Sequence, residues 1–196
     1  MAGDYCRLCR GRFQGSFDCC TSPFTNYPGF LITLSDVNRI VKNTAYKIED
    51  FAKIIFISDE DMGSNKNDSY FKDMMFDNKF LYLYGAGKCP FKGKDGCKIY
   101  KHRPMMCRIH PFWFKKEKKG FEIIVEWGTS AKDEKCLICK KHFKSEDYDF
   151  LLGLIDETRD SMLKTIKQFN DEIEVHKRLK HKLADKSVSK VISEDF

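Results

Sequence analysis

Residues 89–111 read CPFKGKDGCKIYKHRPMMCRIHP, and this stretch carries the densest chemistry in the chain. Its three cysteines are Cys89, Cys97 and Cys107, and most of the charged residues between them are basic. Pro104 suits the first position of a helical turn, and that turn brings Cys107 back toward a hairpin that carries Cys89 and Cys97. We therefore expect the three sulfur atoms to come together in this segment.

Six further cysteines flank this stretch, so the chain holds nine in total. A chain with an odd number of cysteines and no apolar export signal in residues 1–10 favours thiolates held for metal or redox work over a disulfide framework. Buried free thiols are the alternative, but core cysteines rarely gather beside Gly and Pro in loops. We expect the metal ligands to come from Cys6, Cys9, Cys19, Cys20, Cys89, Cys97, Cys107, Cys136 and Cys139.

The ligand type alone leaves the metal open, because four thiolates suit tetrahedral Zn²⁺ and an iron–sulfur cluster almost equally. Nine cysteines are enough for two four-ligand sites with one left over. The adjacent residues Cys19 and Cys20 point apart and so serve different metal atoms or sites, which a single zinc ion does not need. This pattern favours a 4Fe–4S cluster as the cofactor, with zinc as the alternative.

Two arginines, Arg103 and Arg108, lie close in sequence to the central cysteines. Guanidinium groups donate hydrogen bonds to thiolate or sulfide and stabilise excess negative charge, so both are candidates to support the cofactor. Ordinary surface salt bridges are the alternative for both. Among the histidines, His110 is a candidate metal ligand, but a hydrogen-bonding or solvent-facing role is favoured because the chain already has enough thiolates. His102, His142, His176 and His181 show no convergent spacing.

The length of 196 residues and the 42% hydrophobic content fit one domain with a helical extension. No apolar window is long enough to span a membrane, so the cytoplasm is the expected location. The net charge is −1 over residues 1–85, +10 over residues 86–144 and −3 over residues 145–196. The basic segment balances clustered thiolates in our interpretation; nucleic-acid binding is a weaker hypothesis.

Hydrophobic periodicity predicts an α+β fold. We expect helices at 34–43, capped by Ser35, and at 48–57, a surface loop at 58–70, a strand at 79–84, a hairpin at 110–127, and a helix from 146 onward. The strands are expected to form one small antiparallel sheet. Residues 1–144 then form a cysteine-cluster metal-binding domain, residues 145–186 a long C-terminal helix packed on it, and residues 187–196 a flexible tail with little apolar pattern.

From Cys6 to about Cys139 the sequence resembles the cysteine-cluster proteins of the CxxCxxCC, or YkgJ, type. The resemblance rests on the leading cysteines that end in Cys19-Cys20, on a Leu-Thr-x-x-Asp-like stretch at residues 32–36, and on residues 89–112, which match the pattern C-P-(F/L)…C-x-I-Y-x-x-R-P-x-x-C-R-x-(F/H)-P. The family places its leading cysteines close together, whereas nine residues separate Cys9 from Cys19 here. The resemblance implies a centre that holds zinc, iron or an iron–sulfur cluster.

Four functions follow as hypotheses. The first is an iron–sulfur protein with a redox, metal-handling or partner-support role, which implies a protein redox or client partner. The second is a structural zinc protein that binds a partner. Distant similarity to the flagellin lysine N-methylases implies a third, a lysine-modifying enzyme, although Gly85-Ala86-Gly87 leads into Cys89 and does not form a loop for S-adenosylmethionine. The fourth, nucleic-acid binding, rests on the basic segment alone.

Overall fold

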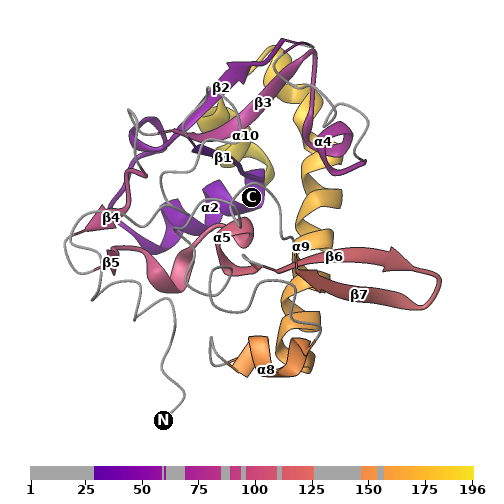
Figure 1. Cartoon of the computed structure of the whole chain (residues 1–196). Helices are drawn as coiled ribbons and strands as arrows, with labels where there is room; N and C mark the ends of the chain where they lie inside the picture. The colour runs from indigo at the N-terminus through magenta and orange to yellow at the C-terminus, as the bar shows by residue number, and fades with distance from the viewer. Residues whose placement is uncertain are drawn as a thin grey trace.

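The computed structural model describes residues 29–58, 60, 69–84, 89–93, 96–109, 112–125, 147–153 and 157–196. Within these residues, a long C-terminal helix runs beside a small sheet, a short N-terminal helix and a projecting hairpin (Figure 1). No helix in the described part of the chain is long and apolar enough to cross a bilayer. The arrangement confirms the predicted α+β class, and the bounds of its elements show why each segment folds as it does.

The helix predicted at residues 34–43 is present with those bounds as α2 (Leu34–Asn43). Its N-cap is Thr33 and not Ser35, because the Thr33 hydroxyl accepts from the Asp36 N–H at 2.9 Å. In return, the Asp36 carboxylate accepts from the Thr33 N–H at 3.0 Å, which completes a capping box. The pair ties the Leu-Thr-x-x-Asp-like stretch into one rigid turn.

A three-stranded antiparallel sheet follows, in the order β1 (Gly29–Leu31), β3 (Lys79–Tyr84), β2 (Ala52–Phe56). The prediction of a strand at 79–84 is confirmed. The prediction of a helix at 48–57 is wrong: only a single 3-10 turn, η2 (Ile48–Asp50), precedes strand β2. The β-branched Ile54 and Ile55 favour extended backbone, and they pair with Leu81 and Phe80 of the central strand.

The cysteine-rich stretch folds into short elements that lie below this sheet in Figure 1. A small hairpin joins β4 (Lys92–Gly93) and β5 (Gly96–Cys97), and a 3-10 turn, η4 (Tyr100–His102), leads to the helix α5 (Met105–Ile109). The helix begins directly after Pro104, as its fixed φ angle predicts. Helix α4 (Ser69–Met74) stands at the other side of the sheet and occupies the end of the segment that we expected to be a loop.

The predicted hairpin is present as β6 (Phe112–Glu117) and β7 (Gly120–Val125), and it projects past the long helix in Figure 1. Its strands pair only with each other among the described residues, so the prediction of one common sheet is wrong. The described strands form three separate antiparallel sheets. The hairpin packs through aromatic contacts instead: the ring centroids of Phe114 and Phe169 are 6.0 Å apart.

The C-terminal part contains α8 (Tyr148–Gly153), α9 (Arg159–Leu179), the 3-10 turn η5 (Lys180–Ala184) and α10 (Val188–Asp195). The expectation that residues 187–196 form a tail without regular structure is wrong. Ser187 caps α10 by accepting from the Lys190 N–H, and Val188, Val191 and Ile192 are buried. Three apolar residues at helical spacing suffice here because α2 lies beside them and supplies a surface to pack against.

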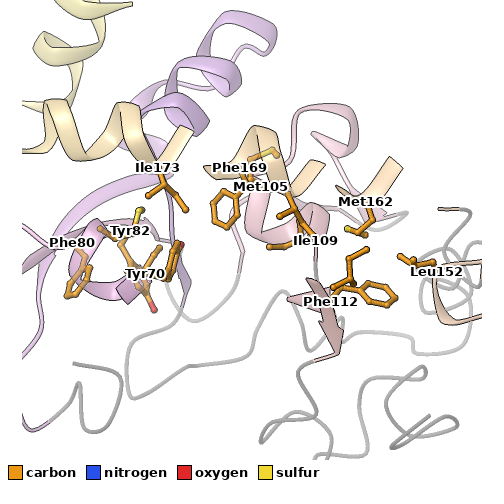
Figure 2. Close-up of a cluster of buried hydrophobic side chains, with 14 of the residues drawn as sticks. Tyr70, Phe80, Tyr82, Met105, Ile109, Phe112, Leu152, Met162, Phe169 and Ile173 are labelled. Carbon is orange, nitrogen blue, oxygen red and sulfur yellow. The ribbon is translucent and has the colours of Figure 1, made fainter. Parts of the chain in front are cut away.

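Two clusters of buried apolar side chains form the core, and α9 contributes to both. The first joins the sheet, α5, the β6–β7 hairpin and α9; Figure 2 shows Tyr70, Met105, Phe112 and Phe169 among its members. The second joins α2, the sheet face that carries Leu81 and Leu83, the β4–β5 hairpin, η5 and α10. The cysteine-bearing elements β5 and α5 are thus anchored on separate parts of the core.

Candidate metal centre

Cys89 and Cys97 are held by the small β4–β5 hairpin. The Cys89 carbonyl accepts from the Lys92 N–H at 3.1 Å, Lys92 pairs with Cys97 across the hairpin, and the Phe91 carbonyl accepts from the Lys98 N–H at 2.9 Å. Both cysteines are half-buried and pack against the second core cluster. The hairpin therefore fixes both side chains at the edge of an apolar surface.

Cys107 lies on α5, a helix of five residues. Met105 and Ile109, four positions apart, are almost completely buried in the first core cluster. Cys107 is half-buried between these two anchors. The helix is too short to be stable alone, so the position of Cys107 depends on what holds α5 in place.

Asp36 is the residue that holds the N-terminus of α5. Its Oδ1 atom accepts from the Met105 N–H at 2.9 Å, and its carboxylate is completely buried. The same carboxylate caps α2 through Thr33 and forms an ion pair with Arg39. One buried side chain therefore joins the start of α2 to the start of the helix that bears Cys107.

Arg39 extends this contact to α9. Its Nη1 atom lies 2.5 Å from Oε1 of Glu172, and its Nη2 atom donates to the Arg103 carbonyl at 3.5 Å. Gln168 donates to Glu172 Oε1 at 3.0 Å. Burial and the nearby charge of Asp36 raise the pKa of Glu172, opposed by Arg39. We call Asp36, Arg39, Gln168 and Glu172 the Asp36 network; it connects α2, α5 and α9 beneath the cysteine-bearing segment.

Arg103 and Arg108 both lie close to Arg39 of the Asp36 network. The Arg103 guanidinium carbon is 3.9 Å from the centre of the Tyr100 ring, and its Nε donates to the Tyr100 carbonyl at 3.1 Å. Arg108 is half-buried, and its Nη1 contacts the Met105 sulfur at 3.7 Å. Burial and the neighbouring charges of Arg39 and Arg103 lower the pKa of Arg108. Within the described residues neither arginine pairs directly with a carboxylate.

His176 is completely buried on α9 and has a structural role. Its Nδ1 accepts from the Leu34 N–H at 3.2 Å, so its Nε2 carries the proton and donates to the Met74 carbonyl at 3.2 Å. Burial lowers the pKa of His176 to about 4, against the opposing effect of the Met74 carbonyl. The neutral ring thus joins α9 to α2 and α4.

The remaining predicted ligands lie outside the described residues: Cys6, Cys9, Cys19, Cys20, Cys136 and Cys139, together with His110. Within the described ranges, no three His, Cys, Asp or Glu side chains gather closely enough to hold a metal ion. Cys89, Cys97 and Cys107 therefore do not complete a site by themselves. Their soft, half-buried donors fit zinc, iron or an iron–sulfur cluster, provided that cysteines from the flanking segments supply the other ligands.

Sequence reasoning missed four residues of this arrangement: Arg39, Gln168, Glu172 and His176. The available signal was the position of Glu172 and His176 on α9, where they alternate with the buried Phe169 and Ile173. Polar residues on the apolar stripe of a helix indicate a buried polar network. Asp36 was part of the noted Leu-Thr-x-x-Asp-like stretch, but its bond to Met105 crosses 69 residues and has no local sequence signal.

The described fold holds Cys89 and Cys97 at a small hairpin and Cys107 on a short helix. A family model, CxxCxxCC, described as "Putative zinc- or iron-chelating domain", matches residues 6–147. The chain belongs to this family. Comparisons with curated proteins and with solved structures gave no match.

Proposed function

We propose that this protein carries an iron–sulfur cluster of the 4Fe–4S type on its clustered cysteines, in a redox, metal-handling or partner-support role. The observation that carries the proposal is the arrangement around Cys107. A half-buried guanidinium, Arg108, follows it directly in sequence, and no carboxylate of the described residues pairs with that charge. A cluster on four thiolates is anionic, so it supplies the negative charge that this environment lacks.

The Asp36 network supports the same proposal because it sets where Cys107 stands. Metal ligands bind tightly when the surrounding protein fixes them before the metal arrives. Here Asp36 holds the first turn of α5, and Arg39 and Glu172 hold Asp36 against α9. In this proposal Cys107 is a preorganised ligand, Cys89 and Cys97 join it from the β4–β5 hairpin, and Arg103 and Arg108 stabilise the bound centre.

We extend the proposal to location and partners. Nine thiols in one chain are best preserved in a reducing compartment, which supports the cytoplasm. The centre's role then requires a protein partner, either a redox partner or a client that receives the metal. Nucleic acid is disfavoured as a partner because the excess basic charge of residues 86–144 is interleaved with the proposed ligands.

Metal and sulfide analysis of protein purified without oxygen tests the proposal. We expect iron, acid-labile sulfide and a broad visible absorption. Cys107→Ser should remove most of this absorption, whereas the adjacent Met106→Leu, which keeps the half-buried apolar contact, should retain it. Stoichiometric zinc with no visible absorption would identify a structural zinc site instead. Protein that contains neither iron nor zinc at stoichiometric level would exclude both kinds of centre.

A further inference from the structure

An open pocket with a volume of about 500 Å³ lies between the end of α2 and the segment that follows the β4–β5 hairpin. Its walls come from the end of α2, the following turn, and the segment from β5 through η4. The side chains that matter for its chemistry are Tyr46, Cys97, Lys98, Tyr100, Lys101 and His102. The volume is in the range of pockets that bind small organic molecules.

The lysine and histidine side chains on this wall give it a basic character. Lys98 and Lys101 are exposed and His102 is half-buried, and no Asp or Glu of the described residues lines the pocket. None of the three basic side chains pairs with a carboxylate in the described part of the chain. The pocket therefore presents uncompensated positive charge to whatever enters it.

Two side-chain hydrogen bonds cover part of the C-terminal end of α2. Asn43 donates to the Arg39 carbonyl at 2.8 Å, and the Thr44 hydroxyl donates to the Ile40 carbonyl at 2.7 Å. The second bond satisfies one of the carbonyl oxygens that a helix C-terminus leaves without an intrahelical partner. An anion that enters the pocket meets two lysines and a histidine.

The aromatic walls are fixed in place from behind. The Tyr46 ring packs edge-on against Phe91, with 4.9 Å between the ring centroids, and Arg103 covers Tyr100 at 3.9 Å. Fixed aromatic walls lower the entropy lost when a ligand binds. Arg103 also adds a further positive charge close to the pocket.

The three basic residues occupy the open positions of the pattern C-x-I-Y-x-x-R-P, where Cys97, Ile99 and Tyr100 are the specified ones. The specified residues line the pocket, and Lys98, Lys101 and His102 at the open positions give the pocket its positive charge. We propose that the pocket binds a small organic anion with at least two negatively charged groups, phosphoryl or carboxylate, beside Cys97. Cys97 is also a proposed ligand of the metal centre, so the pocket and the centre share this residue.

Isothermal titration calorimetry with pyrophosphate and with citrate, at low ionic strength, tests the proposal on the protein as purified. We expect one molecule bound per chain, and Lys98→Gln with Lys101→Gln should weaken binding about tenfold, because two nearby charges are lost. The matched control is Lys118→Gln with Lys119→Gln in the turn between β6 and β7, which removes the same net charge far from the pocket. The control should change the affinity less than about twofold.

A preference for pyrophosphate or for citrate identifies the anionic group. Either preference supports the site if the Lys98/Lys101 double variant loses affinity and the Lys118/Lys119 double variant keeps it. Nuclear magnetic resonance shifts of the His102 ring on titration give an independent readout of position. Equal losses in both double variants, or no saturable binding of either probe, would overturn the proposal. Metal analysis of the same samples keeps this result separate from the cluster: metal without anion binding refutes only the pocket, and anion binding without metal refutes only the centre.

Discussion

The Met105 N–H donates to Asp36 Oδ1 over 2.9 Å, a contact between residues 69 positions apart that joins the first turns of two helices. A helix N-terminus carries unsatisfied N–H groups and a partial positive charge, so a buried carboxylate stabilises both. Asp36 serves α2 and α5 at once, and it does so without exposure to water. The contact makes α2 part of the support for Cys107.

Asp36→Asn should therefore destabilise the fold by about 3 kcal/mol, because it removes the buried ion pair with Arg39 and the carboxylate that accepts from both Thr33 and Met105. Urea unfolding followed by circular dichroism measures this change. The variant should also lose bound metal under conditions where it is still folded, since α5 is no longer held. Asp50→Asn is the matched control: Asp50 accepts from the Lys47 N–H in an exposed turn, and its loss should cost about 1 kcal/mol or less. Equal effects of the two substitutions would contradict the role given to Asp36.

Acid should weaken the fold through His176. The pKa of His176 is about 4 in the folded protein and about 6.5 when exposed. The unfolded chain therefore binds the extra proton first. The stabilising contribution of the neutral ring is complete above pH 6.5 and is lost progressively as the pH falls toward 4, by about 3 kcal/mol in total.

Urea unfolding at a series of pH values checks this slope. His176→Gln should lower stability at pH 7 and flatten the dependence between pH 6.5 and 4, because the titrating ring is gone. His181→Gln, at an exposed position on η5, should leave the slope as it is in the unchanged protein. An undiminished slope in His176→Gln would show that other groups cause the acid sensitivity.

Arg108→Gln should act with opposite sign on the metal-free and metal-bound protein. Without metal the half-buried guanidinium lacks a carboxylate partner among the described residues, so its removal should leave stability unchanged or slightly higher. With the proposed anionic centre bound, the same change removes a stabilising charge and should lower metal occupancy several-fold. Metal content and thermal unfolding of both forms are the measurements. Arg178→Gln, at an exposed position on α9, should alter neither quantity, and a loss of stability in metal-free Arg108→Gln would contradict this account.

The last helix should contribute measurably to stability. Val191 lies on α10 and is completely buried. Val191→Ala should therefore lower the free energy of unfolding by about 2 kcal/mol, through lost apolar contact and the cavity that remains. Ser189→Ala, at an exposed position of the same helix, should change the free energy of unfolding by less than about 0.5 kcal/mol. Differential scanning calorimetry compares the two variants. Equal unfolding temperatures would mean that α10 does not share the cooperative core.

The sequence predicted elements where the local pattern was decisive. Helix α2, strand β3 and the β6–β7 hairpin matched because capping residues, aromatic strand residues and a charged turn act within a few positions. The prediction for residues 48–57 was wrong because their apolar spacing fits a helix, whereas pairing with β3 favours a strand. The α10 helix was missed because its burial depends on α2, about 150 residues earlier in the chain.

The candidate site was predictable only in its residue types. Cysteine spacing and the match to the family pattern identified the chemistry, and the described structure places Cys89 and Cys97 on one hairpin and Cys107 on a neighbouring helix. The complete ligand set stays a prediction, since six of the nine cysteines lie outside the described residues. The Asp36 network could not be predicted, because contacts between Asp36, Met105 and Glu172 depend on how distant helices pack.

The position of α9 in the chain sets an order on biosynthesis. All nine cysteines precede residue 140, whereas Glu172 and His176, which secure the Asp36 network and α2, come after residue 170. A ribosome therefore releases Cys107 before it releases α9, the helix that completes the support of α5. The nascent chain passes through an interval in which Cys107 is present but not yet positioned.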